Sequence, residues 1–174
     1  KVEQRVLWHL LHKMDSALDD IANILEDMRN LTAPYCEQID AIDSIPGFDQ
    51  ESSMKIIAEI SAEPQEYFSS PEKICAWSGL SPRNDESAGK IKSRKTMHGN
   101  RYVKSILCQA AWAAVRVRNS PFHAWFWSHS RKIGRKKAII AIARMSIESF
   151  FMFFTPFFEI YNLFCVPATS GNTN

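Results

Sequence analysis

The sequence lacks the signatures of several common sites. It contains no H-E-x-x-H motif and no glycine-rich phosphate loop of the Walker or dinucleotide-binding type. None of its five histidines pairs with a cysteine at zinc-ligand spacing, and the four cysteines form no C-x-x-C pair. We therefore propose no metal site and no cofactor for this chain, and we interpret the cysteines as reduced thiols in or near the core.

Long hydrophobic runs are also absent. The uncharged run between Glu148 and Glu159 is only ten residues long and contains Pro156, whereas a membrane span needs ~20 apolar residues. The N-terminus has no basic patch followed by an apolar run, so it does not look like a signal peptide. We expect no membrane partner.

The charge is unevenly distributed, although the net charge is only +2. Residues 1–82 carry six Lys and Arg against fifteen Asp and Glu, whereas residues 83–144 carry fifteen against two. A segment this basic attracts a polyanion, and nucleic acid is the usual one. The alternative is a solvated basic face that pairs with the acidic N-terminal part.

Residues 2–32 have the pattern of one long helix. An apolar seam with alternating spacings of four and three residues runs from Leu7 to Met28, which is a three-heptad coiled-coil pattern. A second apolar row at spacing seven flanks it, formed by Leu10, Ala17, Ile24 and Leu31. This pattern predicts a coiled-coil helix over residues 1–33 that packs on its own domain or pairs with a second copy. We expect a homo-oligomer through residues 2–32.

A helix-hairpin-helix-like unit follows. Short helices are expected over residues 35–42 and 51–60, joined by a turn at 44–49 that contains Pro46 and Gly47. In a helix-hairpin-helix motif the backbone N–H groups of the turn face a phosphate, which makes these two residues candidate DNA contacts. The alternative is an ordinary helix–helix turn, where Pro-Gly is common.

The remainder is predicted to be helical with one long basic loop. Ser70-Pro71, Asn100 and Ser120-Pro121 are helix starts, and helices are expected over residues 71–77, 101–118, 120–133 and 138–154. The predicted fold class is all-α. A helical domain spans residues 34–166, and residues 167–174 form a flexible tail.

The loop from Pro82 to Arg101 carries the candidate chemistry. Ser87 stands beside Ala88-Gly89, the one flexible point of this loop. A serine hydroxyl needs a base or a strong local field to act as a nucleophile, and nearby cations stabilise charge on phosphoryl oxygens. His98 is a candidate for a general acid or base, and a helix cap or a phosphate contact are the alternative roles for it. The alternative is an ordinary polar loop serine.

The order of several short motifs resembles the C-terminal domain of the insertion-sequence 110/116/902 family of transposases. The resemblance covers roughly residues 35–145. The motifs, in order, are Ile45–Phe48, Gly79–Pro82, Asn84–Lys90, Gly99–Arg101, Ala110–Ala114 and Gly134–Ala138.

This resemblance implies a DNA recombinase with two halves. The N-terminal half of the family is RuvC-like with an acidic site for a divalent metal such as Mg²⁺, and the C-terminal half supplies a serine that forms a phosphoserine link with DNA. On that pattern Ser87 is the nucleophile. DNA and a structured guide RNA are the expected partners, in the bacterial cytoplasm at the nucleoid. The expected nucleic-acid contacts are Pro46, Gly47, Arg83, Lys90, Lys92, Arg94, Lys95, His98, Gly99, Asn100, Arg101, Lys104, Arg135, Lys136 and Lys137.

The chain departs from the family pattern at three points. It begins at Lys1 with the coiled coil, so we expect a fragment that lacks the RuvC-like half and is inactive alone. Asp49 replaces the usual glycine and repels phosphate, which favours a structural turn. Met97-His98 stand where a basic residue is common, which predicts a weaker or pH-dependent contact. The alternative function is a non-catalytic module for nucleic-acid binding and dimerisation.

Overall fold

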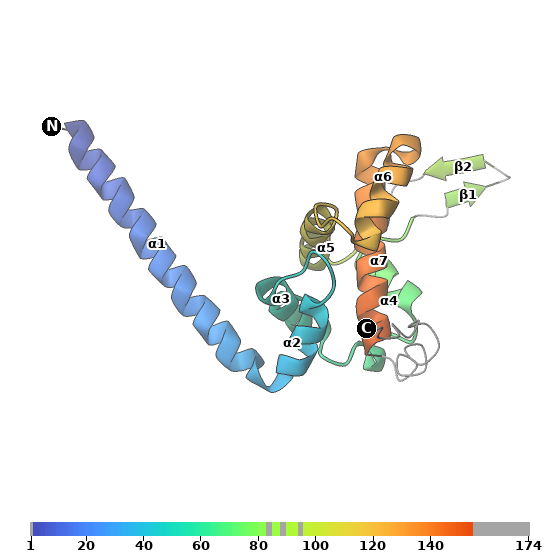
Figure 1. Ribbon diagram of the computed structural model, residues 1–174, viewed down its shortest axis with the longest axis horizontal. Coiled ribbons are helices and arrows are strands. Elements are labelled where there is room, and N and C mark those ends of the chain that lie inside the picture. Colours follow the sequence, from blue (N-terminus) through green and yellow to red (C-terminus); the bar gives the residue numbers. More distant parts are fainter. Residues whose placement is uncertain (1, 83–84, 88–89, 94–95, 155–174) are drawn as a thin grey trace, which may run out of the picture.

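The computed structural model describes residues 2–82, 85–87, 90–93 and 96–154 (Figure 1). Two short 3-10 turns, Ala33–Tyr35 and Pro64–Glu66, connect helices. The main elements, in order, are α1 (Val2–Thr32), α2 (Cys36–Asp43), α3 (Gln50–Ile60), α4 (Pro71–Trp77), β1 (Asp85–Ser87), β2 (Lys90–Ser93), α5 (Arg101–Ala114), α6 (Pro121–Ile133) and α7 (Arg135–Phe153). The all-α class is confirmed, with one small hairpin added. The predicted tail, residues 167–174, lies outside the described residues.

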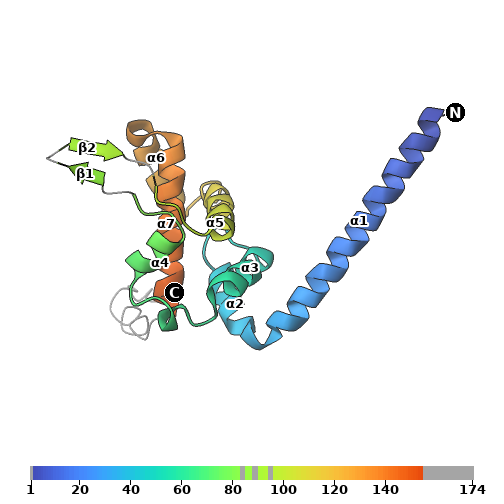
Figure 2. The same cartoon turned by 180° about the vertical axis from the view of Figure 1, so that it is seen from behind.

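Helix α1 extends away from the rest of the molecule (Figures 1 and 2). Its predicted span, residues 2–32, is confirmed, and none of its residues is buried. The helix contacts the body near its C-terminal end, where Met28 packs against the core and α1 meets α3. The 3-10 turn Ala33–Tyr35 follows, and its Pro34 ends α1 because a proline lacks the N–H that would continue the helix.

The turn between α2 and α3 packs closely against α5. Gly47 has a φ of +98°, and a Cβ there would lie 2.2 Å from the carbonyl oxygen of Ala110 and 2.6 Å from the amide nitrogen of Ala114. Only glycine fits this position, because it lacks the Cβ and adopts a positive φ without strain. The small residues on α5 make the close approach possible.

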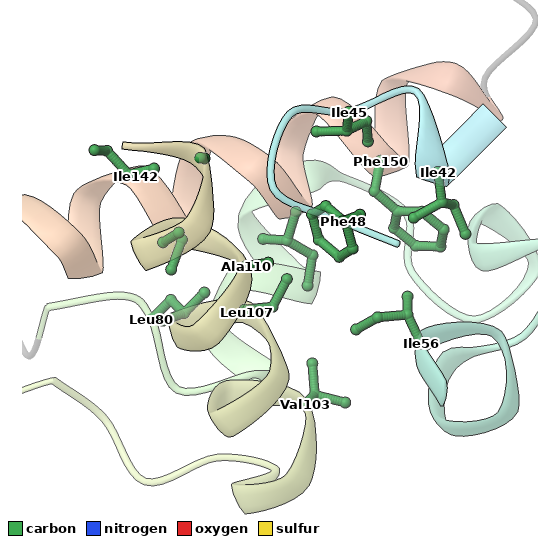
Figure 3. Packing of buried hydrophobic residues seen from close by; sticks show 14 of the residues in the cluster. Ile42, Ile45, Phe48, Ile56, Leu80, Val103, Leu107, Ala110, Ile142 and Phe150 are labelled. Atoms are coloured by element: carbon green, nitrogen blue, oxygen red, sulfur yellow. The ribbon is translucent and has the colours of Figure 1, made fainter. Parts of the chain in front are cut away.

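The body is built around α7, which packs against α4, α5 and α6. Its buried side chains and those of α5 meet the apolar residues of the α2–α3 turn, as Figure 3 shows for Phe48, Leu107 and Phe150. The inner face of α5 lies in this core, since Val103, Leu107, Ala110, Ala111 and Ala114 are all buried. This core fixes the position of α5, the helix that follows the loop of residues 82–101.

The long loop contains a structure that the sequence did not suggest. Residues 85–87 and 90–93 form an antiparallel two-stranded hairpin, β1–β2, with an irregularity between Asp85 and Glu86. Its residues are mostly charged or polar, which is unfavourable for strands, so propensity predicts a loop here. Figure 1 shows the hairpin projecting from the body at the end opposite to the free end of α1.

Two helix boundaries differ from those predicted. Helix α5 ends at Ala114 rather than near residue 118, because Arg116 and Val117 donate to carbonyl oxygens three residues back and Asn119 adopts a φ of +65°. Helix α7 begins at Arg135 rather than residue 138, directly after Gly134 with its φ of +87°. The second difference places three cations in the first turn of a helix.

Candidate nucleic-acid interface

The two ends of the long loop are joined by backbone hydrogen bonds. The amide of Met97 donates to the carbonyl oxygen of Ser81 at 3.0 Å, and the amide of Asn100 donates to Trp77 at 2.9 Å. An isolated antiparallel bridge pairs Pro82 with Thr96. The hairpin β1–β2 therefore rises from a base whose two strands are already fixed to each other.

Two glycines allow the ends of the loop to approach so closely. A Cβ on Gly99 would lie 2.2 Å from the amide nitrogen of Gly79 and 2.4 Å from the carbonyl oxygen of Trp77. Gly79 itself has a φ of +71°. Any side chain at Gly99 would push against backbone rather than against a flexible side chain. Gly99 is thus needed to close the base of the loop.

Lys104 lies beneath this base and holds both ends. Its ammonium donates to the carbonyl oxygen of Gly79 at 2.9 Å and to the Thr96 hydroxyl at 2.9 Å. The side chain is half-buried, where a hydrogen bond from a charged donor is stronger than in water. In the structure Lys104 connects the rigid helix α5 to the loop.

Asn100 has a structural role at the start of α5. Its Oδ1 accepts hydrogen bonds from the amides of Tyr102 and Val103 at 2.9 and 3.1 Å, which caps the helix as predicted. Its Nδ2 donates to Glu59 on α3 at 3.0 Å. The polar atoms of this side chain are engaged within the protein, and they position the loop relative to α3 and α5.

The backbone register of the hairpin brings Ser87 and Lys90 together. Ser87 is the last residue of β1, and its Cα is paired with that of Lys90, the first residue of β2. Residues directly opposite in an antiparallel pair have Cα atoms about 4.5–5.5 Å apart. The candidate nucleophile and a candidate cation therefore occupy neighbouring backbone positions, at the end of β1 and the start of β2.

The other predicted contacts of the loop fall into two groups. Lys92 belongs to β2, His98 is exposed between the hairpin and α5, and Arg101 is exposed as the first residue of α5. Arg83, Arg94 and Lys95 lie outside the described residues. The structure thus brings Ser87, Lys90 and Lys92 onto one hairpin and places His98 at its base.

A second basic group lies at the start of α7. Arg135, Lys136 and Lys137 are all exposed in its first turn, which contains no acidic residue and has no side-chain cap. Cations at a helix N-terminus are unfavourable, because the helix dipole places partial positive charge there. A bound anion would relieve this repulsion, so the arrangement suits a phosphate backbone.

The Pro-Gly turn makes contacts that suit a structural role. Asp49 caps α3: its Oδ1 accepts hydrogen bonds from the hydroxyl of Ser52 at 2.6 Å and from the amide of Ser52 at 2.8 Å, and these two bonds hold the pKa of the carboxyl below its usual value. The amide of Ser52 at this helix start already has a partner in Asp49, and Gly47 faces α5. Phosphate binding by Pro46 and Gly47 stays a prediction.

A partly exposed ionic group lies between α4 and α7, away from the loop. Arg144 donates to Glu148 at 2.7 Å, and the thiol of Cys75 points to the same carboxylate at 3.7 Å. Burial and the negative charge of Glu148 raise the pKa of Cys75 to about 12. This thiol stays protonated at neutral pH and is poorly suited to nucleophilic chemistry.

The structure offers no metal or membrane element within the residues it describes. No group of three His, Cys, Asp or Glu side chains among them is arranged to hold a metal ion. The resemblance places the divalent metal in the RuvC-like half of the family, so no step is assigned to it in the described residues. Among the described helices, none has the length and apolar character needed to cross a bilayer.

Comparison with protein families gives one match. Residues 39–126, just over half of the 174 residues, match the model described as "Transposase IS116/IS110/IS902 family". The chain belongs to this family. No curated protein and no solved structure matched the chain. The match includes the Pro-Gly turn, the hairpin and all of α5, so the resemblance seen in the sequence motifs is confirmed at the level of the family.

Within this transposase, sequence reasoning missed two features of the site. It did not predict that Ser87 and Lys90 are paired, because the surrounding residues are poor strand formers. It assigned Lys104 to nucleic acid but not to the base of the loop, which depends on contacts with residues 25 and 8 positions away. The one available signal was Ala88-Gly89, since a glycine between two short segments is typical of a hairpin turn.

Proposed function

We propose that this transposase uses Ser87 as the nucleophile in DNA strand cleavage and exchange. The observation that supports this most is the register of the hairpin, in which Ser87 is paired with Lys90. The hairpin stands on a base held by Lys104 and Asn100. A serine on a projecting hairpin with a firm base can reach a DNA backbone that a serine in the helical body could not.

The proposed chemistry is a transesterification. The Ser87 oxygen attacks the phosphorus of a phosphodiester, a P–O bond to serine forms, and the P–O bond to one sugar oxygen breaks. The serine proton passes to a base, and the departing sugar oxygen takes up a proton. Reversal by a sugar hydroxyl of another strand completes exchange and releases the serine. No nucleotide cofactor is needed, because the phosphoserine link conserves the phosphodiester bond.

Charge stabilisation in this step falls to the surrounding cations. Negative charge builds on the phosphoryl oxygens in the transition state, and positioned cations are effective at stabilising it. Lys90 and Lys92 share the hairpin with Ser87. We propose that they act here together with Arg83, Arg94, Lys95 and Arg101, and that His98 at the base of the hairpin contacts phosphate or transfers a proton.

We propose that DNA also binds the first turn of α7. The exposed residues Arg135, Lys136 and Lys137 would contact the phosphate backbone without reading the sequence. Each phosphate neutralised releases counterions, so affinity falls as salt rises. Replacing the three with glutamine should weaken binding to all DNA sequences alike and reduce the salt slope by about 2–3. An unchanged slope would show that this turn does not touch DNA.

A structured guide RNA is the second proposed ligand. The same cations bind an RNA backbone, because phosphate contacts do not distinguish the two polymers. Ribonuclease treatment of the purified protein should remove a bound, discrete RNA species if this is right. Heterogeneous fragments, or none, would oppose it.

A non-catalytic nucleic-acid module remains the competing function. It is favoured by the structural use of Asn100 and Lys104, whose polar atoms bind protein groups. Incubation with DNA carrying a nick near the exchange site, which traps a covalent intermediate, distinguishes the two. We expect a protein–DNA adduct that survives denaturation and maps to Ser87. Tight DNA binding without any adduct would favour the non-catalytic module.

We propose that α1 is the element of self-association, and that residues 34–166 form the unit that acts on DNA. The seam of α1 is exposed to solvent, with 49% of Leu11 and 59% of Leu18 accessible. Exposed apolar stripes of this size usually mark a protein–protein contact. Bringing two chains together would also bring two Ser87 hairpins to one DNA exchange site.

A further inference from the structure

Helices α5 and α6 present two tryptophans to solvent. Trp112 on α5 is 45% exposed and Trp127 on α6 is 49% exposed. Tryptophan is highly buried on average, so two half-exposed rings on one part of the surface are typical of a contact surface. We propose that this surface binds a single-stranded segment of nucleic acid, with unpaired bases stacked on the two indole rings. The inference rests on the proposed binding of nucleic acid, but not on the chemistry of Ser87.

The two rings are held against one buried side chain. Phe126, which is 2% exposed, has its ring centroid 6.3 Å from that of Trp112 and 5.4 Å from that of Trp127. Phe126 therefore connects the tryptophan of α5 to the tryptophan of α6. Because both indoles contact the same ring, they belong to one patch of surface rather than to two unrelated positions.

A histidine helps to fix the orientation of Trp127. The Nδ1 of His123 donates to the carbonyl oxygen of Val115 at 2.6 Å, which ties the imidazole to the end of α5. The ring centroid of His123 lies 6.1 Å from that of Trp127. Trp127 thus contacts two rings, those of Phe126 and His123, that are themselves held in place. A ring with a fixed orientation loses little side-chain entropy when a base stacks on it.

Each tryptophan is followed by an arginine four residues later. Trp127 and Arg131 both lie on α6, where side chains four residues apart share one face. Trp112 precedes Arg116, whose amide donates to the carbonyl oxygen of Ala113 and so continues the last turn of α5. Both arginines are exposed. The arrangement twice supplies what one nucleotide needs, an aromatic face for the base and a cation for the phosphate.

The sequence around this patch is basic throughout. Residues 96–147 contain no Asp or Glu. Arg118 and Lys132 add two exposed cations beside Arg116 and Arg131. Within the part of the chain that the structure describes, none of these four cations forms an ion pair. Cations without acidic partners attract a polyanion. The repeated pairing of a ring with a cation suits a polymer of nucleotides, and it favours nucleic acid over a protein partner.

The geometry favours a single strand over a duplex. Within a double helix the bases are stacked on one another, and a protein reaches only their edges and the backbone. Indole rings on the outer surface of a helix can stack only on bases that are unpaired. Figures 1 and 2 show α6 and the hairpin β1–β2 at the same end of the body. Trp127 therefore belongs to the end of the molecule where strand exchange is proposed to occur.

Unpaired bases occur in two of the proposed ligands, a DNA strand opened for exchange and a loop of the guide RNA. Stacking on an indole does not distinguish them, because the bases of both have an aromatic face. Binding of labelled oligothymidine and oligouridine of equal length to the full-length transposase separates the two sources. Binding of either supports the site, and the tighter of the two identifies the source. Binding of neither would overturn the proposal.

Photo-crosslinking tests the stacking contact itself. A single strand with iodouracil at successive positions is bound to the full-length transposase with Ser87→Ala, which removes the proposed nucleophile, and is then irradiated. Iodouracil couples to an aromatic ring on which it stacks, and peptide mass analysis finds the coupled residue. We expect crosslinks at Trp127 and Trp112. Crosslinks only at other residues would overturn the stacking site.

Two replacements of Trp127 separate stacking from apolar packing. Trp127→Leu keeps an apolar contact with Phe126 but removes the aromatic face, whereas Trp127→Phe keeps a smaller one. Trp127→Leu should weaken single-strand binding about five- to hundredfold, and Trp127→Phe should weaken it less. Trp8→Leu, at a ring that is 67% exposed on α1, is the control and should leave the affinity unchanged. Equal single-strand affinities of Trp127→Leu and the parent would overturn the proposal.

Duplex DNA distinguishes a failure of this inference from a failure of the proposed function. A duplex offers its phosphates but not the faces of its bases, so Trp127→Leu should leave duplex affinity within about twofold of the parent. If the parent binds duplex DNA and Trp127→Leu binds single strands as tightly as the parent, only the stacking site is overturned. If the parent binds neither duplex nor single strand, the proposed function fails as well.

Discussion

The side-chain ammonium of Lys104 donates a 2.9 Å hydrogen bond to the carbonyl oxygen of Gly79, across 25 residues of chain. A second bond, to Thr96, holds the returning end of the loop. Lys104 stands on α5, which is anchored in the core by Val103 and Leu107. The contact therefore ties the hairpin that carries Ser87 to a helix whose inner face lies in the core.

Loss of this contact should loosen the base of the hairpin. Lys104→Met keeps most of the apolar stem but removes both bonds, and a hydrogen bond from a charged group contributes ~1.5–3 kcal/mol. Amide exchange of Met97, whose N–H is bonded to Ser81, should then become about tenfold faster or more. Lys73→Met, at an exposed position on α4, is the control and should leave this exchange unchanged. Equal rates in both variants would mean that Lys104 does not hold the loop.

Alanine variants of Gly47 and Gly134 distinguish the cost of a positive φ from the cost of close packing. Both have a positive φ, but a Cβ at Gly134 would meet nothing within 4 Å, whereas one at Gly47 would collide with α5. Alanine at either position pays for the positive φ, about 1–2 kcal/mol. Gly47→Ala should cost a further ~1–3 kcal/mol from overpacking. Similar losses of unfolding free energy in the two variants would contradict the packing of the turn on α5.

Asp49 gives the stability of α3 a dependence on pH. Its hydrogen bonds with Ser52 lower its folded pKa below 3.8, so its contribution is complete above that pH and disappears as pH falls through the folded value. Asp49→Ala should reduce unfolding free energy by ~1 kcal/mol at pH 7, and by less at pH 3. Asp49→Asn, which also caps helices, should lose little at pH 7. A pH-independent loss in the alanine variant would contradict the role of the ionised carboxylate.

The cysteines should differ sharply in reactivity. Cys36 is exposed, whereas Cys75 is buried with a pKa of about 12 and burial also raises the pKa of Cys108. At pH 8 alkylation of the folded protein should modify Cys36 rapidly and Cys75 only after unfolding, because the thiolate is the reactive form. Peptide mass analysis of the time course measures each site. Rapid modification of Cys75 in the folded protein would show that the α4–α7 contact opens readily.

The sequence predicts the helices well where local signals are strong. The spans of α1 and α4 follow from the heptad seam and from Ser70-Pro71, and the buried face of α5 follows from its small residues. The end of α5 was misplaced, because Asn119 with its positive φ gives no clear local signal. The hairpin was missed because charged residues disfavour strands, and its pairing depends on a base assembled from distant segments. The contacts that Lys104 makes with Gly79 and that Asn100 makes with Glu59 were missed for the same reason, because their partners are distant in the sequence.

Strand exchange by the full-length transposase with Ser87→Ala tests the central claim most directly. Ser93→Ala, in the partner strand of the same hairpin, is the matched control. We expect Ser87→Ala to abolish covalent attachment and strand exchange while DNA affinity stays within about twofold of the parent. Ser93→Ala should retain exchange. Undiminished exchange by Ser87→Ala would contradict the assignment of Ser87 as the nucleophile.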